Sequence, residues 1–211
     1  MKLRVVAVNA SPRARGNTYD MLSRALEPLQ EAGWQTDLLQ IGRKSVRGCS
    51  ACFKCFKNKD MRCVLPEDAV SQAMPYLLAA DAVILGSPVY FSSVTTEMKA
   101  LLDRTGIVAL GNGNVMKGRI GAAVVALRRG GDIHAYDTIN HFFLMSHMIV
   151  PGSSFWNMGF GEMPGDVVKD DREAVHNMTN LGKTIAWLGG LLAPAREGMP
   201  ELWNRYADIK W

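Results

Sequence analysis

Short apolar segments alternate with amphipathic segments along the 211-residue chain, and this alternation limits the fold more than any other feature. Residues 3–8 (L-R-V-V-A-V) form a mostly apolar run of the kind found in buried parallel strands. Residues 18–32 then carry apolar side chains at helical spacing, and Gly33 ends that segment as a C-terminal glycine does. Repeated strand–helix units of this size predict a parallel sheet covered by helices on both faces.

The rest of the chain continues the pattern as one α/β domain over residues 1–211. We expect Pro66 to open a helix, with Glu67 and Asp68 in its first turn. A compact insert at residues 43–65 interrupts the alternation after the second strand. Further strands are predicted at residues 35–41, 82–85, 119–127 and 148–150, and further helices at residues 95–105, 132–147 and 169–192.

Composition and charge exclude several classes of protein. A hydrophobic content of 48% suits one domain that buries roughly 70% of its extended-chain surface. The first apolar stretch is too short for the core of a signal peptide, and no run reaches the roughly 18 apolar residues of a membrane span. We therefore expect a soluble cytoplasmic protein without a membrane role. The net charge of +4 is too mild to suggest nucleic-acid binding.

All four cysteines lie within fifteen residues of the insert, in the pattern C-x2-C-x2-C-x7-C: Cys49, Cys52, Cys55 and Cys63. Two-residue spacings let a short loop place three thiolates around one corner of a cubane, and the fourth cysteine closes the cage. Bacterial ferredoxins use the same C-x2-C-x2-C core, although Pro usually follows their fourth cysteine and Val64 does so here. The spacing therefore predicts that the four cysteines bind a [4Fe–4S] cluster.

Other interpretations of the cysteines stay open. Four-cysteine zinc sites usually pair two separate C-x2-C knuckles, and a third cysteine so close crowds tetrahedral geometry. Disulfides need an oxidising compartment, which nothing in the sequence suggests. A loop of reduced thiols is a further alternative, because oxygen readily strips exposed clusters.

The insert is strongly basic. Seven cations face the single acid Asp60: Arg43, Lys44, Arg47, Lys54, Lys57, Lys59 and Arg62. This is either a solvated loop or a field that stabilises a reduced cluster and attracts an acidic partner such as a ferredoxin.

The first turn, N-A-S-P-R-A-R-G-N-T at residues 9–18, leaves a strand and opens a helix. Such a turn presents backbone N–H groups and a positive dipole end to an anion. It is neither a dinucleotide G-x-G-x-x-G motif nor a Walker A loop. A polar turn with an ordinary helix cap is the alternative to a phosphate site. The candidate phosphate ligands are Ser11, Arg13, Arg15, Gly16, Asn17 and Thr18.

Two later turns follow the third and fourth strands, at the end of the sheet where open α/β folds bind ligands. In the first of them, backbone amides of residues 89–92 could contact the edge of a planar heterocycle, and Tyr90 or Phe91 could stack on its face. In the second, R-R-G-G could close over the ring and stabilise negative charge on a reduced flavin, or could be a plain strand-to-helix turn. The candidate residues are Pro88, Val89, Tyr90, Phe91 and Ser92, followed by Arg129, Gly130 and Gly131.

Together the S-P-R-x-x-G-N-T, G-S-P-V-Y-F and R-R-G-G turns resemble the NAD(P)H-dependent FMN reductase branch of flavodoxin-fold proteins. With the cysteine loop, the chain is similar to iron–sulfur flavoproteins. This resemblance implies a flavodoxin-like doubly wound sheet in the order 2-1-3-4-5. It implies FMN bound at the three turns and a [4Fe–4S] cluster on the cysteines. It also implies a homodimer or homotetramer in which the cluster of one subunit approaches the FMN of another.

The chain departs from the family pattern at three places. Ala10 replaces the usual Gly, which is a small-for-small change, and Asp132 replaces the more usual Gln, which puts the contacts of that loop in doubt. Residues 145–164, with Phe155 and Trp156 among several glycines, match no motif, and this segment is expected to line a substrate site or a subunit interface.

The function that follows is an oxidoreductase that relays electrons from NAD(P)H or reduced ferredoxin to a small oxidant such as oxygen, peroxide or a quinone. The cofactors carry the chemistry, and the four scattered histidines suggest no acid–base residue. Two alternatives stay open. One is a two-electron NAD(P)H-dependent FMN or quinone reductase with an empty or structural cysteine loop. The other is a non-enzymatic electron carrier like flavodoxin.

Overall fold

The computed structural model describes residues 2–200 and is built on a five-stranded, all-parallel sheet. The strand order is β2-β1-β3-β4-β5, which confirms the predicted flavodoxin-like topology. Ala82 pairs with both Val5 and Ile120, so the three central strands lie in one continuous register. The strands are β1 (Arg4–Asn9), β2 (Gln35–Gln40), β3 (Ala82–Pro88), β4 (Ile120–Leu127) and β5 (Met158–Phe160).

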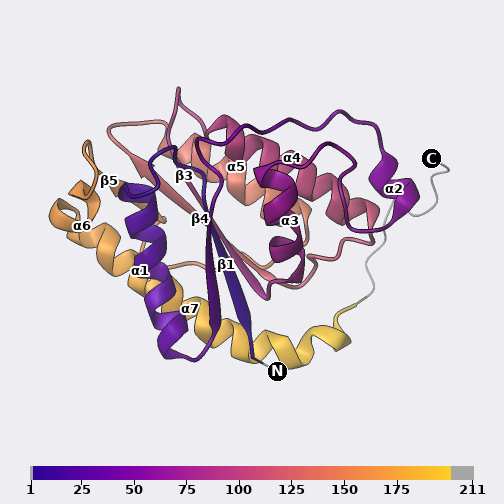
Figure 1. The fold of residues 1–211 in the computed structure, drawn as a ribbon. Helices are drawn as coiled ribbons and strands as arrows, with labels where there is room; N and C mark the ends of the chain where they lie inside the picture. The colour runs from indigo at the N-terminus through magenta and orange to yellow at the C-terminus, as the bar shows by residue number, and fades with distance from the viewer. Residues whose placement is uncertain (1, 201–211) are drawn as a thin grey trace.

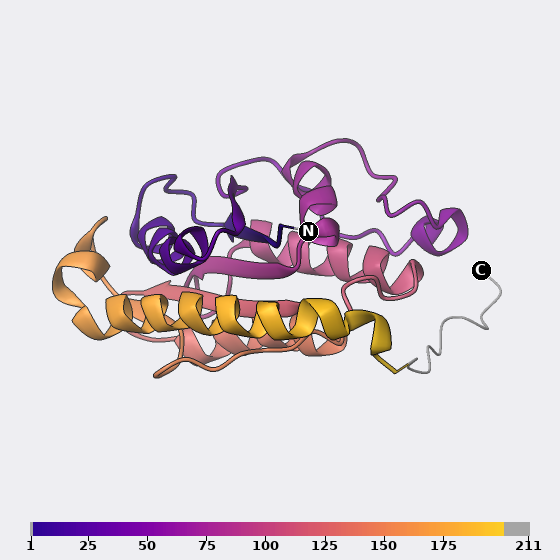
Figure 2. The same ribbon diagram turned by 90° about the horizontal axis from the view of Figure 1, so that it is seen from below.

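Helices cover both faces of the sheet (Figure 1). On one face α1 packs along α7, and on the other lie α3, α4 and α5. Figure 2 shows α7 running along the sheet, with α2 standing apart from it. The helices are α1 (Asn17–Glu31), α2 (Lys54–Asn58), α3 (Ala69–Ala79), α4 (Thr96–Gly111), α5 (Asp132–Met145), α6 (Asp166–Asp170) and α7 (Arg172–Ala195), and a 3-10 turn follows at Arg196–Gly198.

The alternation of side chains along β1 explains why the sheet needs both layers. Val6 and Val8 pack into the core under α3, α4 and α5, whereas Val5 and Ala7 pack into the core under α1 and α7. All of β4 is buried, as expected for a parallel strand covered on both faces. The two cores hold the sheet between helices and leave its carboxyl ends free to carry a site.

Three sequence predictions were wrong in detail. Residues 148–150 form only an isolated bridge from Ile149 to Ile120, and the fifth strand is Met158–Phe160. Asp68 is the N-cap of α3, accepting a hydrogen bond from Ser71 N at 2.9 Å, so the helix begins at Ala69 rather than at Pro66. The long final helix is split into α6 and α7, and the cysteine insert contains the short helix α2.

The helices within residues 2–200 were also compared with the requirements of a membrane span. None of them is both long enough and apolar enough to cross a bilayer.

Candidate functional site

A cavity of about 180 Å³ opens at the carboxyl ends of the strands, between the turn after β1 and the turns after β3, β4 and β5. Seven of the predicted site residues line it: Ser11, Arg13, Asn17, Thr18, Pro88, Val89 and Tyr90. Sequence reasoning missed the other five: Ala126, Leu127, Arg128, Gly161 and Glu162. Gly161 and Glu162 directly follow β5. Placing that strand correctly would have identified them, because ligands in such sheets sit beyond strand ends.

The N-terminus of α1 faces this cavity without a side-chain cap. Its N-cap is Gly16, in extended backbone with φ −163°, and no side chain accepts a hydrogen bond from the first turn. The N–H groups of a helix start therefore remain available to an anion, where the helix dipole also favours negative charge. Thr18 is 2% exposed and lines the cavity, and its hydroxyl has no hydrogen-bond partner within the described residues.

A network of amide side chains braces the turn after β1. Asn9 Oδ1 accepts a hydrogen bond from Ser11 N at 3.0 Å, and Asn9 Nδ2 donates to Gln40 Oε1 at 2.7 Å. Gln40 Nε2 then donates to Ser11 O at 2.7 Å and to Gly42 O at 3.1 Å. A Cβ at Gly42 would lie 2.0 Å from Ser11 O, so only glycine fits there. The end of β2 thus fixes the backbone of the turn.

Asn17 ties the start of α1 to the segment after β5. Its Oδ1 accepts hydrogen bonds from Gly165 N at 2.9 Å and from Val167 N at 3.4 Å. Its Nδ2 lies beside Gly161 in the cavity wall, because a Cβ on that glycine would come within 2.5 Å of it. Asn17 therefore closes the cavity with one end of its amide and leaves the other end as a donor.

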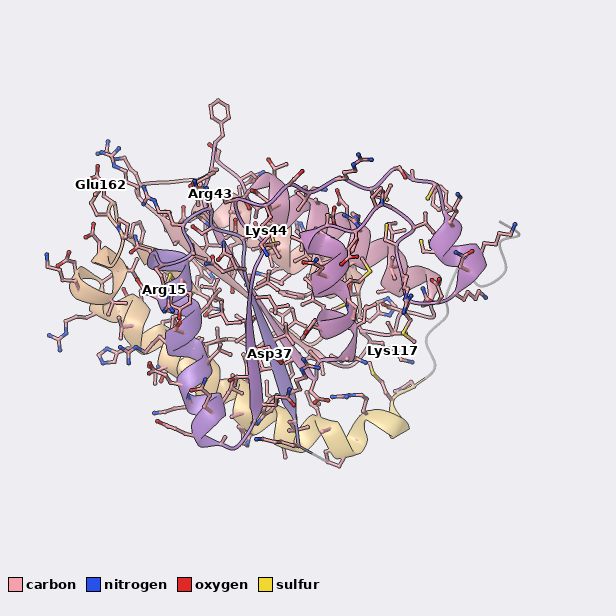
Figure 3. All side chains as sticks on the ribbon, viewed as in Figure 1. Arg15, Asp37, Arg43, Lys44, Lys117 and Glu162 are labelled. Carbon is pink, nitrogen blue, oxygen red and sulfur yellow. The ribbon has the colours of Figure 1, made fainter. Side chains whose placement is uncertain are left out.

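The two arginines predicted for this turn lie in different places. Arg13 lines the cavity. Arg15 instead donates a hydrogen bond to Tyr19 Oη and lies 4.3 Å from the centre of that ring, so it does not reach the cavity. Figure 3 shows Arg15 beside α1, below Glu162 and Arg43, which lie beyond the carboxyl ends of β5 and β2. Glu162 and Arg128, which both line the cavity, form an ion pair with 3.1 Å between Glu162 Oε1 and Arg128 Nη2.

The turn after β3 is a tight hairpin. Tyr90 N donates to Ser93 O at 2.8 Å and Ser93 N donates to Tyr90 O at 3.1 Å. Phe91 (φ 49°) and Ser92 (φ 69°) both adopt left-handed backbone, and the Phe91 side chain is fully exposed. Backbone in this region costs free energy and is concentrated at functional sites. The hairpin presents its aromatic side chains beside the cavity rather than burying them.

The turn after β4 packs directly on this hairpin. Gly131 has φ +87°, and an added Cβ would lie 2.9 Å from both the Ser92 Cα and a Val89 methyl group. Glycine is therefore required there for conformation and for close approach. Gly131 is also the N-cap of α5 and provides no side-chain cap. The predicted residues Phe91, Ser92, Arg129, Gly130 and Gly131 are thus held together at the rim, outside the lining of the cavity.

The cysteine loop lies apart from this cavity, along the α4 side of the sheet. Cys55 is buried, Cys63 is half-buried, and Cys49 and Cys52 are exposed. No three His, Cys, Asp or Glu side chains within residues 2–200 are grouped closely enough to hold a single metal ion. The backbone N–H of Ala51 donates a hydrogen bond to Cys49 Sγ at 3.4 Å.

The backbone of this loop is unusually strained. Four non-glycine residues within eleven positions adopt left-handed backbone: Ala51, Phe53, Lys59 and Met61. Left-handed backbone persists only where its surroundings over-determine it, so the loop conformation is set by more than local preference.

The thiols of the loop lie in different environments. A hydrogen bond from the Lys54 backbone, helped by the Ser50 side chain, lowers the pKa of Cys52. Burial raises the pKa of Cys55, and the neighbouring Cys63 and Cys49 raise it further.

A buried arginine joins the two ends of the cysteine loop. The Arg104 side chain is fully buried in α4, and its guanidinium donates to Asp68 Oδ2 at 2.6 Å, Ser71 Oγ at 2.7 Å and Arg47 O at 3.2 Å. Burial raises the pKa of Asp68, but the hydrogen bonds from Ser71, Arg104 and Arg47 outweigh it and lower that pKa overall.

Further contacts to α4 secure the loop between these ends. Arg43 N donates to Glu97 Oε1 at 3.1 Å, and Met61 N donates to Asn112 Oδ1 at 3.0 Å. The loop is therefore anchored at its ends, at Met61 and through Cys55 and Phe56, which are buried in the core beside α4, while Cys49 and Cys52 stay exposed.

Comparison with known proteins was made by sequence and by structure. A family model described as NADPH-dependent FMN reductase matches residues 3–162. An iron–sulfur flavoprotein of Methanocaldococcus jannaschii is 32% identical over 87% of this chain and 96% of its own length. An iron–sulfur flavoprotein of Methanosarcina thermophila is 28% identical over 87% of this chain and 93% of its own length.

Solved structures show the same fold at low sequence identity. RosB, crystallised with 8-demethyl-8-formylriboflavin-5'-phosphate, superposes with a TM-score of 0.69 at 15% identity, covering 99% of this chain and 91% of RosB. A WrbA-like flavodoxin from Agrobacterium tumefaciens superposes with a TM-score of 0.63 at 14% identity, covering 91% of this chain and 99% of that one.

Proposed function

The chain belongs to the NADPH-dependent FMN reductase family and, within it, to the iron–sulfur flavoproteins, and from this premise we propose that it relays electrons between FMN and a [4Fe–4S] cluster. It is an FMN-dependent oxidoreductase. FMN supplies exchange of electrons in pairs or singly, and an iron–sulfur cluster supplies exchange of single electrons. The proposal concerns the residues that hold each group and the electron donors and acceptors.

The uncapped N-terminus of α1, which faces the part of the cavity lined by Arg13, Ser11 and Thr18, carries the flavin part of the proposal. A phosphate needs several donors and positive charge, and the turn offers main-chain N–H groups, Ser11, Thr18 and Arg13 around one opening. The residues therefore fit an FMN phosphate. In this arrangement the brace from Gln40 keeps the donors in place before the phosphate arrives.

The two rim turns suit the flavin ring. The Tyr90–Ser93 hairpin exposes the aromatic side chains of Tyr90 and Phe91, and the Gly131 turn, which starts α5 without a side-chain cap, lies against it. Aromatic faces stack on planar rings, and helix N-termini favour negative charge. These residues would position the ring and stabilise its reduced, anionic form. They are Pro88, Val89, Tyr90, Phe91, Ser92, Arg129, Gly130 and Gly131, with Arg128 added from the cavity wall.

The chemistry of the cysteine loop fits a cluster better than a single ion. A cubane places one thiolate on each of four irons, so its ligand sulfurs lie farther apart than those around one zinc ion. Within residues 2–200 no three of the ligating side chains are grouped closely enough to hold one metal ion. The loop has anchored ends and carries its four sulfurs at separate positions. Such a loop is suited to close around an iron–sulfur cluster, which is larger than a single metal ion.

The electron donor is proposed to be NAD(P)H or a reduced ferredoxin, and the acceptor a small oxidant such as oxygen, peroxide or a quinone. All seven cations of residues 43–62 are exposed, which supports attraction of an acidic protein such as ferredoxin to this loop. Phe53, Met61 and Val64 are also exposed there, which supports cover by a neighbouring subunit in a homodimer or homotetramer.

Anaerobic purification followed by iron, sulfide and flavin analysis tests the proposal. We expect one FMN and four irons with four sulfides per subunit, and an absorbance spectrum with both flavin and cluster bands. One FMN without iron, after anaerobic reconstitution of the cluster has also failed, would favour the two-electron reductase instead. Bound zinc would assign the cysteines to a structural metal site.

A further inference from the structure

The two sequence features that matched no family motif meet in one cavity. Asp132, which stands where the family usually has Gln, and the aromatic pair Phe155 and Trp156 line a space of about 160 Å³ on the outer side of β5. Phe160 completes its aromatic wall. The cavity adjoins the proposed flavin cavity, because Phe160 directly precedes Gly161 in the lining of that cavity, and Asp132 directly follows Gly131 at its rim.

The aromatic side chains of this cavity are exposed, yet their backbone is firmly held. Phe155 and Trp156 are 58% and 53% exposed, with ring centres 5.2 Å apart. Asn177 of α7, which is buried, donates to Trp156 O at 2.7 Å and accepts from Phe155 N at 3.0 Å. Large aromatic groups that a rigid support keeps in solvent mark a binding site more often than a packing error.

The polar side chains of this cavity are acidic. Asp132, Asp171 and Glu173 line it, and no Lys, Arg or His of the described residues does so. Asp171 is engaged as the cap of α7 and accepts from Phe160 N at 2.9 Å. Asp132 and Glu173 form no ion pair with any residue in the range 2–200. On a chain of net charge +4, this cavity therefore has the opposite sign to the protein as a whole.

We propose that this cavity binds a small organic cation with a ring or quaternary ammonium group, next to the flavin. Aromatic faces attract such cations, and unpaired carboxylates add to that attraction. The volume lies below the roughly 300–1,000 Å³ of sites for drug-sized ligands, so a single-ring cation is the right size. Only the position of this site relative to the redox centre depends on the proposed flavin site.

Calorimetric titration of the FMN-loaded protein with benzyltrimethylammonium tests the proposal. We expect saturable binding to one site, weaker binding of neutral benzyl alcohol and no binding of benzoate. Trp156→Leu should lower the affinity for the cation at least about fivefold, whereas Trp156→Phe keeps an aromatic face and should retain most of that affinity. The double variant Asp132→Asn with Glu173→Gln should also weaken it at least about fivefold.

Asp137→Asn is the matched control, because Asp137 is an exposed acid of the same helix α5 outside the cavity, and it should leave the affinity unchanged. Flavin content and thermal unfolding of each variant establish that it is folded. Equal affinities for the cation, the alcohol and the anion would overturn the proposal, as would cation binding unaffected by Trp156→Leu. If the variants of the flavin turn fail to change FMN binding, the proposed function fails while this titration keeps its own result.

Discussion

The turn after β1 and the cysteine loop were both identified from short motifs, but the fold treats them differently. In the turn, Asn9 and Gln40 fix the backbone, and the cavity wall is complete within the described residues. In the loop, Arg104 fixes the ends, while Cys49 and Cys52 remain exposed on strained backbone. A site made from the ends of strands and helices is finished by folding, whereas the exposed cysteines of the insert are expected to take their final arrangement only with the proposed cluster.

The sharpest test of this contrast is Cys52→Ser. Loss of one of four thiolates should remove nearly all iron and sulfide from each subunit, because a cluster with a missing ligand is no longer held. FMN should stay at one per subunit, since no cysteine lines the flavin cavity. Iron, sulfide and flavin analysis measures both, with Ser50→Ala as the control from the same loop. Loss of FMN together with the iron would show that the two regions are not independent.

Arg104→Met should produce the next largest effect. Removal of one partner of a buried ion pair costs about 3–5 kcal/mol, and this is the upper bound here, because Asp68 is only partly buried and keeps its hydrogen bonds from Ser71 and Arg47. Denaturant unfolding should show a decrease of up to that size, and limited proteolysis should cut within residues 43–65. The control is Lys99→Met, which breaks the exposed Lys99–Asp103 pair of the same helix and should cost at most about 1 kcal/mol. A stable, protease-resistant Arg104→Met variant would mean that the cysteine loop does not need the hydrogen bonds of Arg104 to hold its ends.

Arg13→Ala should weaken FMN binding about ten- to 150-fold. The lost charged hydrogen bond to the phosphate contributes about 1.5–3 kcal/mol. Equilibrium titration with FMN and with riboflavin, which lacks the phosphate, should show the loss for FMN alone. Arg15→Ala is the matched control, because Arg15 contacts Tyr19 rather than the cavity and should change FMN affinity little. Equal losses in both variants would restore Arg15 as a phosphate ligand.

Gln40→Glu should have the smallest effect of the set. The new side chain can still accept from Asn9, but it cannot donate to Ser11 O or Gly42 O. With about 0.5–1.5 kcal/mol for each lost hydrogen bond, FMN binding should weaken roughly tenfold and riboflavin binding should not change. Gln30→Glu, which alters an exposed amide bonded to Thr36, provides the control. Parallel losses for both flavins would mean that the brace supports the whole site and not the phosphate turn.

The sheet order, and the residues by which the turn after β1 lines the cavity, could be predicted because they depend on local patterns. Buried parallel strands require apolar runs, and an anion turn requires small and polar residues between a strand and a helix. The fifth strand could not be placed, because residues 148–150 and 158–160 are both short and both reach β4, and only the extent of that pairing decides between them. Gly161 and Glu162 were missed for the same reason. The rotation of Arg15 onto Tyr19 likewise depends on side-chain contacts that spacing does not encode.

The hydrogen bonds from Gly165 and Val167 to Asn17 imply an order in which the turn after β1 and the cysteine loop can be completed during synthesis of the chain. Every partner described above that anchors the cysteine loop lies at or before Asn112, so this loop can acquire its supports when little more than half of the chain has been made. The flavin turn emerges first, but its cavity wall and the partners of Asn17 come only with residues 161–167. The earliest segment to be synthesised is therefore the last to become a finished site.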